Sequence, residues 1–334
     1  MPVLNCAQAM KAIAVENPGQ HYQLVLHEVP APRPGAGQVL IKVAGAGLNN
    51  ADLLQARGLY PPPPGASSIL GMEVSGVITG LGEGVHDCKI GDAVCALLPG
   101  GGYAEFAVAD AGCILPVPQS VDLVEAAGLP EATFTAWANI VDAGRLQAGE
   151  TLLIHGGTSG IGSLAIQIFA ARGHLIFTTA GSDTKCESAL RFGAARAINY
   201  HSEDFVAVVK EETNGEGVDV ILDMVGGSYI QRNIEAAAPW GRIVNIAYQE
   251  SFKADVNFRP VLTKRLTLAA TTLRGRDAAQ KQAIRDTLAR EVWPLLGRRI
   301  RPVTDRTFPL ADATQAHDFM GKTGHIGKIL LDLT

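Results

Sequence analysis

The segment 151–173, TLLIHGGTSGIGSLAIQIFAARG, constrains the fold more than any other part of the chain. It reads as a short apolar strand, a turn that contains four glycines, and an apolar helix. Strand candidates follow at 174–180, 197–200, 217–225 and 241–247, and a last one lies at 266–272, with helical segments between most of them. This alternation predicts a parallel, doubly wound sheet of the Rossmann type.

The sequence before residue 120 has a different texture. Short β-like runs at 22–29, 38–47, 73–82, 92–98 and 103–109 are broken by Gly and Pro, and only 51–57 has helical character. This spacing predicts an antiparallel or barrel-like β domain. The tail after Arg276 reads helix, strand, helix, strand, and we assign it back to the first domain. The expected α/β organisation is therefore 1–125 and 276–334 for the β domain and 126–275 for the Rossmann domain.

Size and composition agree with two compact domains. The chain has 334 residues, of which 47% are hydrophobic and 18% charged. A net charge of −5 gives no basic field for nucleic acid, and no run of 18 apolar residues predicts a membrane span. No secretion signal precedes Met10, and MPVLNCAQA reads as a short extension. A cytoplasmic protein without nucleic-acid or membrane partners is expected.

The cysteines are expected to be reduced thiols. Five of them are scattered without a Cys-x-x-Cys pair. A zinc site of Cys88, Cys95 and Cys113 lacks the paired spacing of structural zinc sites.

The glycine turn predicts a dinucleotide site, because backbone N–H groups at a helix N-terminus bind a pyrophosphate. Two registers fit the G-x-G-x-x-G pattern. Gly157, Ser159 and Gly162 begin where the strand ends, whereas Gly160, Gly162 and Ala165 begin three residues later. We prefer the first register, because the pattern starts at the end of the strand.

The next strand ends in FTTAGSDTK, which carries no acid at the position where an NAD site accepts a bond from the 2'-hydroxyl. Ser182 can donate to a 2'-phosphate, and Lys185 can reach it from the first turn of the following helix. Asp183 beside them is expected to point to water. These residues predict NADPH as the cofactor.

The turn is also close in letters to that of short-chain dehydrogenases, but no tyrosine here is followed by lysine four positions later. Other matches occur in order along nearly the full length: VLIKVAGAGLNNADLLQARGLYPPPPG, GMEVSGVITGLGEGV, GDAVCALLPGGGYAEF, PEATFTAW, HGGTSGIG, INY and HIGKILLDL. With them the chain resembles the medium-chain dehydrogenase/reductase superfamily, in its zinc-free quinone oxidoreductase (zeta-crystallin-like) branch. The resemblance implies a GroES-like domain, a Rossmann domain and a homodimer.

Zinc enzymes of that superfamily place a cysteine near Asn49 and Gly-His-Glu where this chain has Gly71, Met72 and Glu73. The resemblance therefore implies no metal site, and Glu73 is interpreted as a structural carboxylate. A quinone spreads the charge that hydride transfer leaves, so an oriented hydrogen-bond donor and a placed nicotinamide suffice. NADPH-dependent quinone reduction is the predicted reaction.

The resemblance also implies the site residues. Asn49 and Tyr60 would lie near the nicotinamide and the substrate oxygen, with Tyr60 held by the stiff run Pro61–Pro64. The remaining cofactor contacts would be Thr135, Gly157, Thr158, Ser159, Gly160, Ile161, Gly162, Ser182, Lys185, Tyr200, Asn245, Ala247, Leu273, Arg274 and Lys328.

Some of these residues also have a purely structural interpretation: Asn49 in a loop, Thr135 packed within its helix and Tyr200 half-buried in a strand. Two other functions stay open. One is NADPH-dependent reduction of an enal or enone double bond, and the other is a non-catalytic NADPH-binding protein, crystallin-like or RNA-binding.

Overall fold

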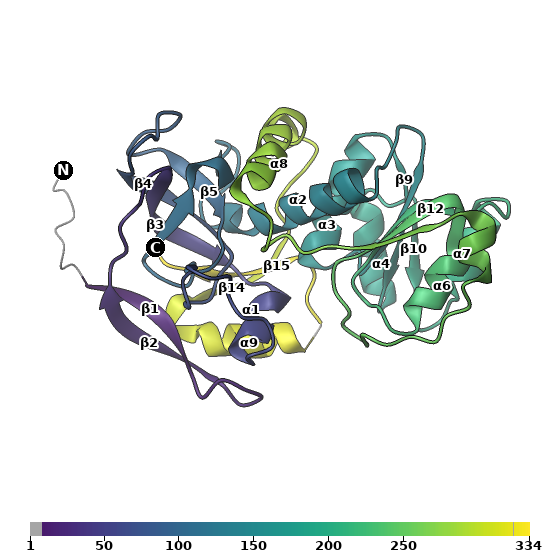
Figure 1. The fold of residues 1–334 in the computed structure, drawn as a ribbon, viewed down its shortest axis with the longest axis horizontal. Helices are drawn as coiled ribbons and strands as arrows, with labels where there is room; N and C mark the ends of the chain where they lie inside the picture. Colours follow the sequence, from purple (N-terminus) through teal and green to yellow (C-terminus); the bar gives the residue numbers. More distant parts are fainter. Residues whose placement is uncertain (1–8, 323) are drawn as a thin grey trace. The chain divides into compact units, whose positions relative to one another are not determined.

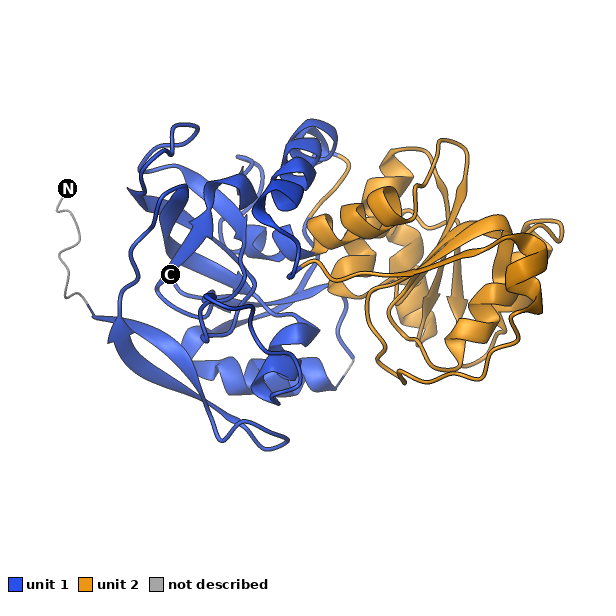
Figure 2. Ribbon diagram, in the orientation of Figure 1, with its two compact units in different colours: residues 1–131, 274–298, 302–334 blue, residues 132–273, 299–301 orange. Residues whose placement is uncertain are grey.

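The computed structural model describes residues 9–322 and 324–334, and the extension predicted before Met10 lies almost wholly outside them. The chain divides into two compact units, coloured separately in Figure 2. Unit 1 comprises residues 1–131, 274–298 and 302–334, and unit 2 comprises residues 132–273 and 299–301. The sequence-based boundaries, after residues 125 and 275, differ from these by a few residues.

Unit 1 is built mainly from β-strands, labelled in Figure 1. Its strands are β1 (Ala9–Glu16), β2 (Gln23–Pro30), β3 (Gln38–Gly47), β4 (Glu73–Leu81), β5 (Ala93–Leu97), β6 (Phe106–Asp110), β7 (Ile114–Pro116), β14 (Thr304–Pro309) and β15 (Lys328–Asp332). Its α-helices are α1 (Asn50–Ala56), α8 (Ala278–Glu291) and α9 (Ala313–Gly321). The first strand was not singled out from the sequence.

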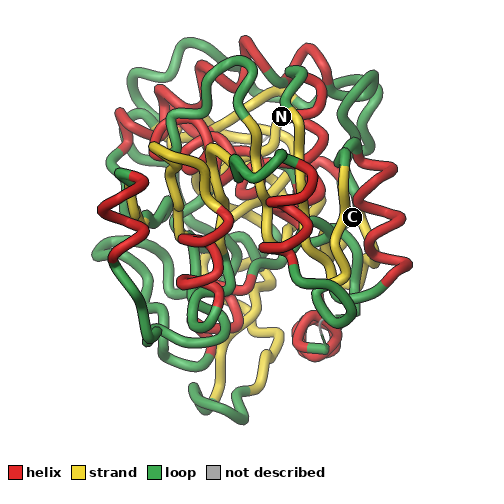
Figure 3. Tube along the Cα trace, turned by 90° about the vertical axis from the view of Figure 1, so that its right-hand side faces the viewer, coloured by secondary structure: helices red, strands yellow, loops and turns green. Residues whose placement is uncertain are grey.

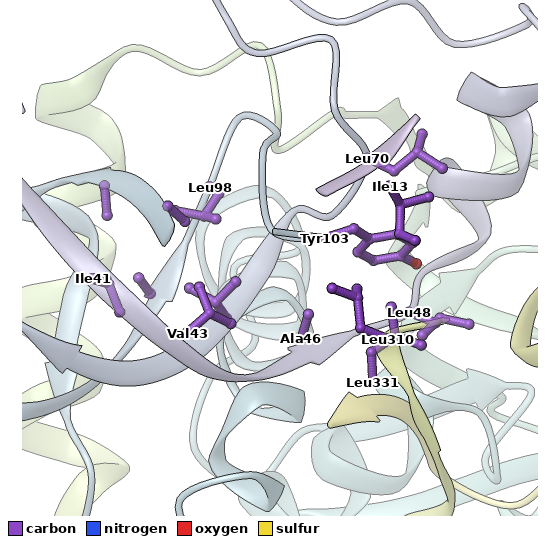
Figure 4. Close-up of a cluster of buried hydrophobic side chains, with 14 of the residues drawn as sticks. Ile13, Ile41, Val43, Ala46, Leu48, Leu70, Leu98, Tyr103, Leu310 and Leu331 are labelled. Carbon is purple, nitrogen blue, oxygen red and sulfur yellow. The ribbon is translucent and has the colours of Figure 1, made fainter. Parts of the chain in front are cut away.

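The larger sheet of unit 1 has the order β14-β15-β3-β4-β5-β7, and β6 also pairs with β3. Every pairing in it is antiparallel except that of β14 with β15. The tail of the chain therefore completes a sheet that the N-terminal part begins, since Leu331 lies opposite Ala46. Figure 4 shows the apolar core on this sheet, in which Ile13, Leu48, Tyr103 and Leu331 belong to one buried cluster.

Unit 2 contains a six-stranded parallel sheet of the order β10-β9-β8-β11-β12-β13. In chain order within the unit this is 3-2-1-4-5-6, the doubly wound order of Rossmann folds, so the predicted fold class is confirmed. The strands are β8 (Thr151–His155), β9 (Leu175–Ala180), β10 (Arg196–Asn199), β11 (Val218–Asp223), β12 (Ala237–Asn245) and β13 (Thr267–Ala270).

Helices, drawn in red in Figure 3, alternate with these strands along the chain. They are α2 (Pro130–Ala136), the π-helix Trp137–Ala143, α3 (Gly160–Ala171), α4 (Asp183–Phe192), α5 (Phe205–Glu212), α6 (Tyr229–Ala236) and α7 (Arg259–Lys264). Leu153 of β8 packs with Phe205 and Ile234 of α5 and α6, whereas Trp137 stacks on Phe169 of α3. Among the described residues no helix is long and apolar enough to cross a bilayer.

Candidate functional site

The glycine turn of unit 2 follows β8 directly. Gly156 has φ +70°, a left-handed conformation that favours glycine, and turns the chain out of the strand. Ser159 then caps α3, since its Oγ accepts the N–H of Gly162 at 3.0 Å. The N–H groups of Gly160 and Ile161 lie in the first turn of α3, where the helix itself provides no acceptor for them. The helix N-terminus thus offers donors to an anion, and the turn fits a dinucleotide pyrophosphate.

Close packing explains two of the glycines. A Cβ at Gly157 would collide with Thr178 Oγ1 of β9, and one at Gly162 would collide with the carbonyl oxygen of Gly156. Gly162 is therefore the position where α3 packs closely against the turn that follows β8. Gly157, which only the first register includes, packs closely against β9, and this favours the register Gly157, Ser159, Gly162. Sequence reasoning gave no role to Gly156, although its left-handed φ makes the turn.

A buried polar network holds the carboxyl edge of the sheet beside this turn. His155 at the end of β8 bonds through Nδ1 to Thr179 Oγ1 and through Nε2 to Asn233 Oδ1, at 3.0 and 2.7 Å. Asp223 at the end of β11 accepts from the amides of Asn233 and Asn245. Burial lowers the pKa of His155, so its imidazole is neutral. Asn245, a predicted cofactor contact, already donates its amide to this network.

The residues predicted to meet a 2'-phosphate lie at the end of β9 and the start of α4. Ser182 caps α4 by accepting the N–H of Lys185, and Lys185 lies in the first turn. Asp183 is exposed in the first turn of α4, as expected, and it also accepts from Asn199 Nδ2 at 2.7 Å. The hydroxyl of Tyr200 lies close over Gly181, where a Cβ would clash with it. β9 itself ends without a carboxylate, and Asp183 is the first acid that follows it in the chain.

A buried ion pair lies at the centre of the predicted site in unit 1. Lys328 of β15 is 5% exposed and Glu73 of β4 is 0% exposed, and their charged atoms are 2.5 Å apart. The ammonium also donates to Asn49 Oδ1 and to the carbonyl of Leu48, both at 2.8 Å. Asn49 Nδ2 in turn donates to Glu73 Oε1 at 2.9 Å. The structural role predicted for Glu73 agrees with these contacts.

This arrangement changes the role open to Asn49. Its Nδ2 also makes a long bond of 3.5 Å to the carbonyl of Gly47, so neither amide hydrogen is free. Asn49 was predicted to lie near the nicotinamide and the substrate oxygen, and this position stays a prediction. With these contacts Asn49 can accept another hydrogen bond through Oδ1, but both N–H groups of its amide are already used.

A catalytic zinc does not fit the same residues. The zinc-enzyme ligand positions carry Asn49 and Met72 here, and the Lys328 ammonium binds to the amide and carboxylate oxygens that would remain. No cluster of three or more His, Cys, Asp or Glu side chains is placed to hold a metal anywhere in residues 9–322 and 324–334.

A chain of hydrogen bonds in unit 1 was not anticipated. Asp52, 0% exposed, accepts from the N–H of Asn49 and from the hydroxyl of Tyr103. Tyr103 bonds to His317 Nε2 at 3.2 Å, and Tyr22 bonds to His317 Nδ1 at 2.9 Å. Burial raises the pKa of Asp52 to about 6 and lowers that of His317 to about 3. Because four separate segments contribute these side chains, no local pattern could reveal them.

Tyr60 and Arg274 lie together in unit 1. The guanidinium carbon of Arg274 is 5.3 Å from the centre of the Tyr60 ring, a cation–π contact. Burial and the charge of Glu131 raise the pKa of Tyr60, so its hydroxyl stays protonated at neutral pH. A protonated phenol is able to donate, as the predicted role of Tyr60 requires.

The remaining predicted contacts lie in unit 2 near its sheet or its chain ends. Thr135 is 5% exposed in α2, and its carbonyl accepts from Asn139 Nδ2 at 2.8 Å. Leu273 is buried and Ala247 is half-buried. Their cofactor contacts, like those of Lys328, stay predictions.

Both parts of the chain match known families. Residues 35–119 match the alcohol dehydrogenase GroES-like domain, and residues 160–289 match the family described as zinc-binding dehydrogenase. A curated relative, a phenolphthiocerol/phthiocerol polyketide synthase protein of Mycobacterium tuberculosis, is 33% identical over 328 residues. The match covers 98% of this chain and 15% of that protein, so the chain spans about one seventh of the relative's length.

Solved structures extend the comparison. The CurK enoyl reductase is 28% identical, with a TM-score of 0.81 over 97% of this chain and 99% of that one. A quinone oxidoreductase of Pseudomonas syringae is 25% identical, with a TM-score of 0.82 over 97% of this chain and all of that one. Similarity over both units supports the predicted GroES-like and Rossmann folds.

The phosphate-binding role of Lys185 predicts selective loss of NADPH affinity. Lys185→Ala is expected to raise the Michaelis constant for NADPH roughly tenfold or more, because a charge-assisted bond contributes about 1.5–3 kcal/mol. The constant for NADH should change little. Steady-state kinetics with both cofactors checks this, with the exposed Lys253→Ala as the control. An equal effect on both cofactors would rule out the 2'-phosphate contact.

The buried His317 predicts acid sensitivity of unit 1. A histidine with folded pKa about 3 and unfolded pKa about 6.5 contributes stability above pH 6.5, which is lost as the pH falls from 6.5 toward 3. Below pH 6, the free energy of unfolding falls by about 1.4 kcal/mol for each pH unit because of this histidine. Asp52, with its raised pKa, has the opposite slope between about 4 and 6, but it is present in wild type and variant alike.

His317→Gln should therefore be less stable than the wild type at pH 7 by about 1–3 kcal/mol. Because only the wild type loses stability through protonation of His317, the difference in unfolding free energy between the two proteins should become smaller as the pH falls to 5. Urea unfolding at pH 7, 6 and 5 measures the gap. His21→Gln, at an exposed histidine, serves as the control. A gap that is constant with pH would contradict a neutral His317.

Proposed function

Because the chain belongs to the medium-chain dehydrogenase/reductase family, we propose that it is an NADPH-dependent reductase of carbon–carbon double bonds conjugated to a carbonyl. Compounds of the 2-enoyl type are the first substrate class, and quinones are the second. The 2-enoyl class corresponds to the enal or enone alternative left open by the sequence.

The observation that carries the proposal is the kind of donor that unit 1 offers to a substrate oxygen. Tyr60 supplies a hydroxyl and Arg274 a guanidinium, whereas Lys328 and Glu73 already occupy the amide of Asn49. A simple alkoxide needs a strong Lewis acid, but a conjugated acceptor delocalises its developing charge onto an oxygen that hydrogen bonds can stabilise. The donor set therefore favours conjugated acceptors.

Unit 2 supplies the residues that would hold the cofactor. The pyrophosphate fits the N–H groups of Gly160 and Ile161, and the 2'-phosphate fits Ser182 and Lys185, with Tyr200 beside them. Bound NADPH supplies the hydride. Tyr60 would donate to the substrate oxygen, and its raised pKa keeps the proton on the phenol until it is needed.

The order of the two substrate classes rests on the comparisons. The CurK protein is named an enoyl reductase and is 28% identical, and the curated relative quoted above belongs to a polyketide synthase. Two solved structures named quinone oxidoreductases are 25% identical, which keeps quinones as the second class.

We also propose a homodimer, as the sequence predicted. Strand β13 lies at the end of the sheet order, so one of its edges is free within the described sheet. Leu268 on it is 42% exposed and Leu262 of the preceding helix is 79% exposed. An unprotected apolar edge favours pairing with a second copy.

A panel of acceptors tests the proposed function. With NADPH we expect the highest kcat/KM for a 2-hexenoyl thioester of N-acetylcysteamine, followed by 2-hexenal, a 1,2-quinone and a 1,4-quinone. A clear preference for either quinone would reverse the order of the two classes. NADPH binding without oxidation by any acceptor would instead revive the non-catalytic alternative.

Tyr60→Phe tests the donor. Removal of the hydroxyl should lower kcat roughly a hundredfold, in the range of a lost general acid, while the dissociation constant for NADPH stays within twofold. Stopped-flow turnover and fluorescence titration separate the two quantities. Leu59→Ala, at the 70% exposed neighbour, controls for disturbance of the loop. Unchanged turnover by the phenylalanine variant would leave Tyr60 and the prolines a structural role only.

A further inference from the structure

Arg274 uses only part of its hydrogen-bonding capacity. Its side chain is buried, with 8% of the residue exposed. Nε donates to the carbonyl of Pro99 at 2.9 Å, and Nη2 donates to the same carbonyl and to Gln55 Oε1 at 2.6 and 2.8 Å. Nη1 is buried and has no hydrogen-bond partner among the described residues. A guanidinium carries five N–H groups, so the two on Nη1 remain unused.

An unpaired charged donor at this depth is costly. Leaving a buried donor without an acceptor costs about 1–3 kcal/mol, and more when it is charged. No ion pair of the described residues includes Arg274. The carboxylates of Asp52 and Glu131 are close enough to interact with Arg274 electrostatically, but neither accepts a hydrogen bond from Nη1. Nη1 of Arg274 therefore lacks an acceptor among the described residues.

The donor is rigidly held next to Tyr60. Gln55 of α1 accepts from Arg274 and donates through Nε2 to the carbonyl of Ser68, which lies in the same loop as Tyr60. The Pro99 carbonyl binds two nitrogens of the same guanidinium. The Tyr60 ring completes the surroundings through its cation–π contact. Fixed donors are what stabilises charge in a transition state without reorganisation.

We propose that Nη1 of Arg274 binds the substrate oxygen that becomes negatively charged during reduction. This inference rests on the proposed function and assigns the group that stabilises its intermediate. Hydride from NADPH forms a C–H bond at the β-carbon, the double-bond electrons shift to the carbonyl oxygen, and NADP⁺ remains. The enolate oxygen pairs with Arg274. Tyr60 passes its proton to that oxygen and regains one from water, and the resulting enol rearranges to the saturated carbonyl compound by proton exchange with water.

The two N–H groups on Nη1 of Arg274 also suit an anionic oxygen of the cofactor. A cofactor contact of Arg274 is what the sequence predicted. A carboxylate, an enolate and a phosphate share this chemistry, so the test must separate substrate from cofactor. Three variants serve: Arg274→Gln removes the charge, Arg274→Lys keeps it without the fork, and Arg274→Ala opens space for a small cation. Arg276→Gln, two residues later and half-buried, is the matched control.

For substrate binding, Arg274→Gln should lower kcat on the 2-hexenoyl thioester roughly 10²–10³-fold, as for loss of an oxyanion donor. The NADPH dissociation constant of Arg274→Gln should stay within twofold of the wild-type value. The kcat of Arg274→Lys should lie between those of the wild type and Arg274→Gln. Millimolar guanidinium should partly restore Arg274→Ala, an effect that a purely structural arginine would not show. A loss of NADPH affinity equal to the loss in kcat/KM would assign the oxygen to the cofactor, and wild-type turnover by Arg274→Gln would overturn the proposal.

A binding experiment separates this inference from the proposed function. Hexanoate, a stable carboxylate, should bind the NADP⁺-loaded wild-type protein by calorimetry and bind Arg274→Gln at least tenfold more weakly. If the wild type reduces no acceptor but shows this difference, the proposed function fails and the oxygen site stands. If hexanoate binds both proteins equally or neither, the inference fails whatever the activity.

Discussion

Unit 1 depends on one buried cation, the ammonium of Lys328. Taking such a charge out of water costs several kcal/mol, and it is tolerated only when every donor is used. Here all three N–H groups are accounted for by Leu48, Asn49 and Glu73. Glu73 also accepts the N–H of Glu131 through its other oxygen. The last strand, the start of α1, β4 and the start of α2 are thus joined through one carboxylate and one ammonium.

Unit 2 also contains a buried charged group, the carboxylate of Asp223, which hydrogen bonds stabilise. Asp223 is fully buried without an ion pair, yet it accepts from the backbone N–H groups of Val225 and Gly226 and from the amides of Asn233 and Asn245. Asn233 passes the network on to His155, which ends the strand before the glycine turn. The geometry of the turn is therefore set by packed side chains and by the hydrogen bonds of Asp223 and His155, within the protein itself.

Local patterns predicted the elements well and the interactions between them poorly. The strand ending at His155 and the turn beginning at Gly156 were visible because strand, glycine and helix follow one another within 23 residues. The contacts of Asn49 could not be predicted, because its amide partner, Glu73, and its ammonium partner, Lys328, lie 24 and 279 residues away. Likewise Tyr22, Asp52, Tyr103 and His317 meet only after the sheet of unit 1 has formed, so no spacing encodes them.

The two buried cations of unit 1 differ in what they can offer a substrate. All three N–H groups of the Lys328 ammonium are bound to protein oxygens, so it can act on a ligand only through its electric field. The adjacent carboxylate of Glu73 largely cancels that field. Among the residues that the structure describes, Arg274 has no counter-ion in contact and keeps the two N–H groups of Nη1 unpaired. An oxygen that gains negative charge is therefore stabilised by Arg274 and not by Lys328. Because that stabilisation grows with the charge on the oxygen, it favours the enolate-like transition state over the neutral substrate and so lowers the barrier.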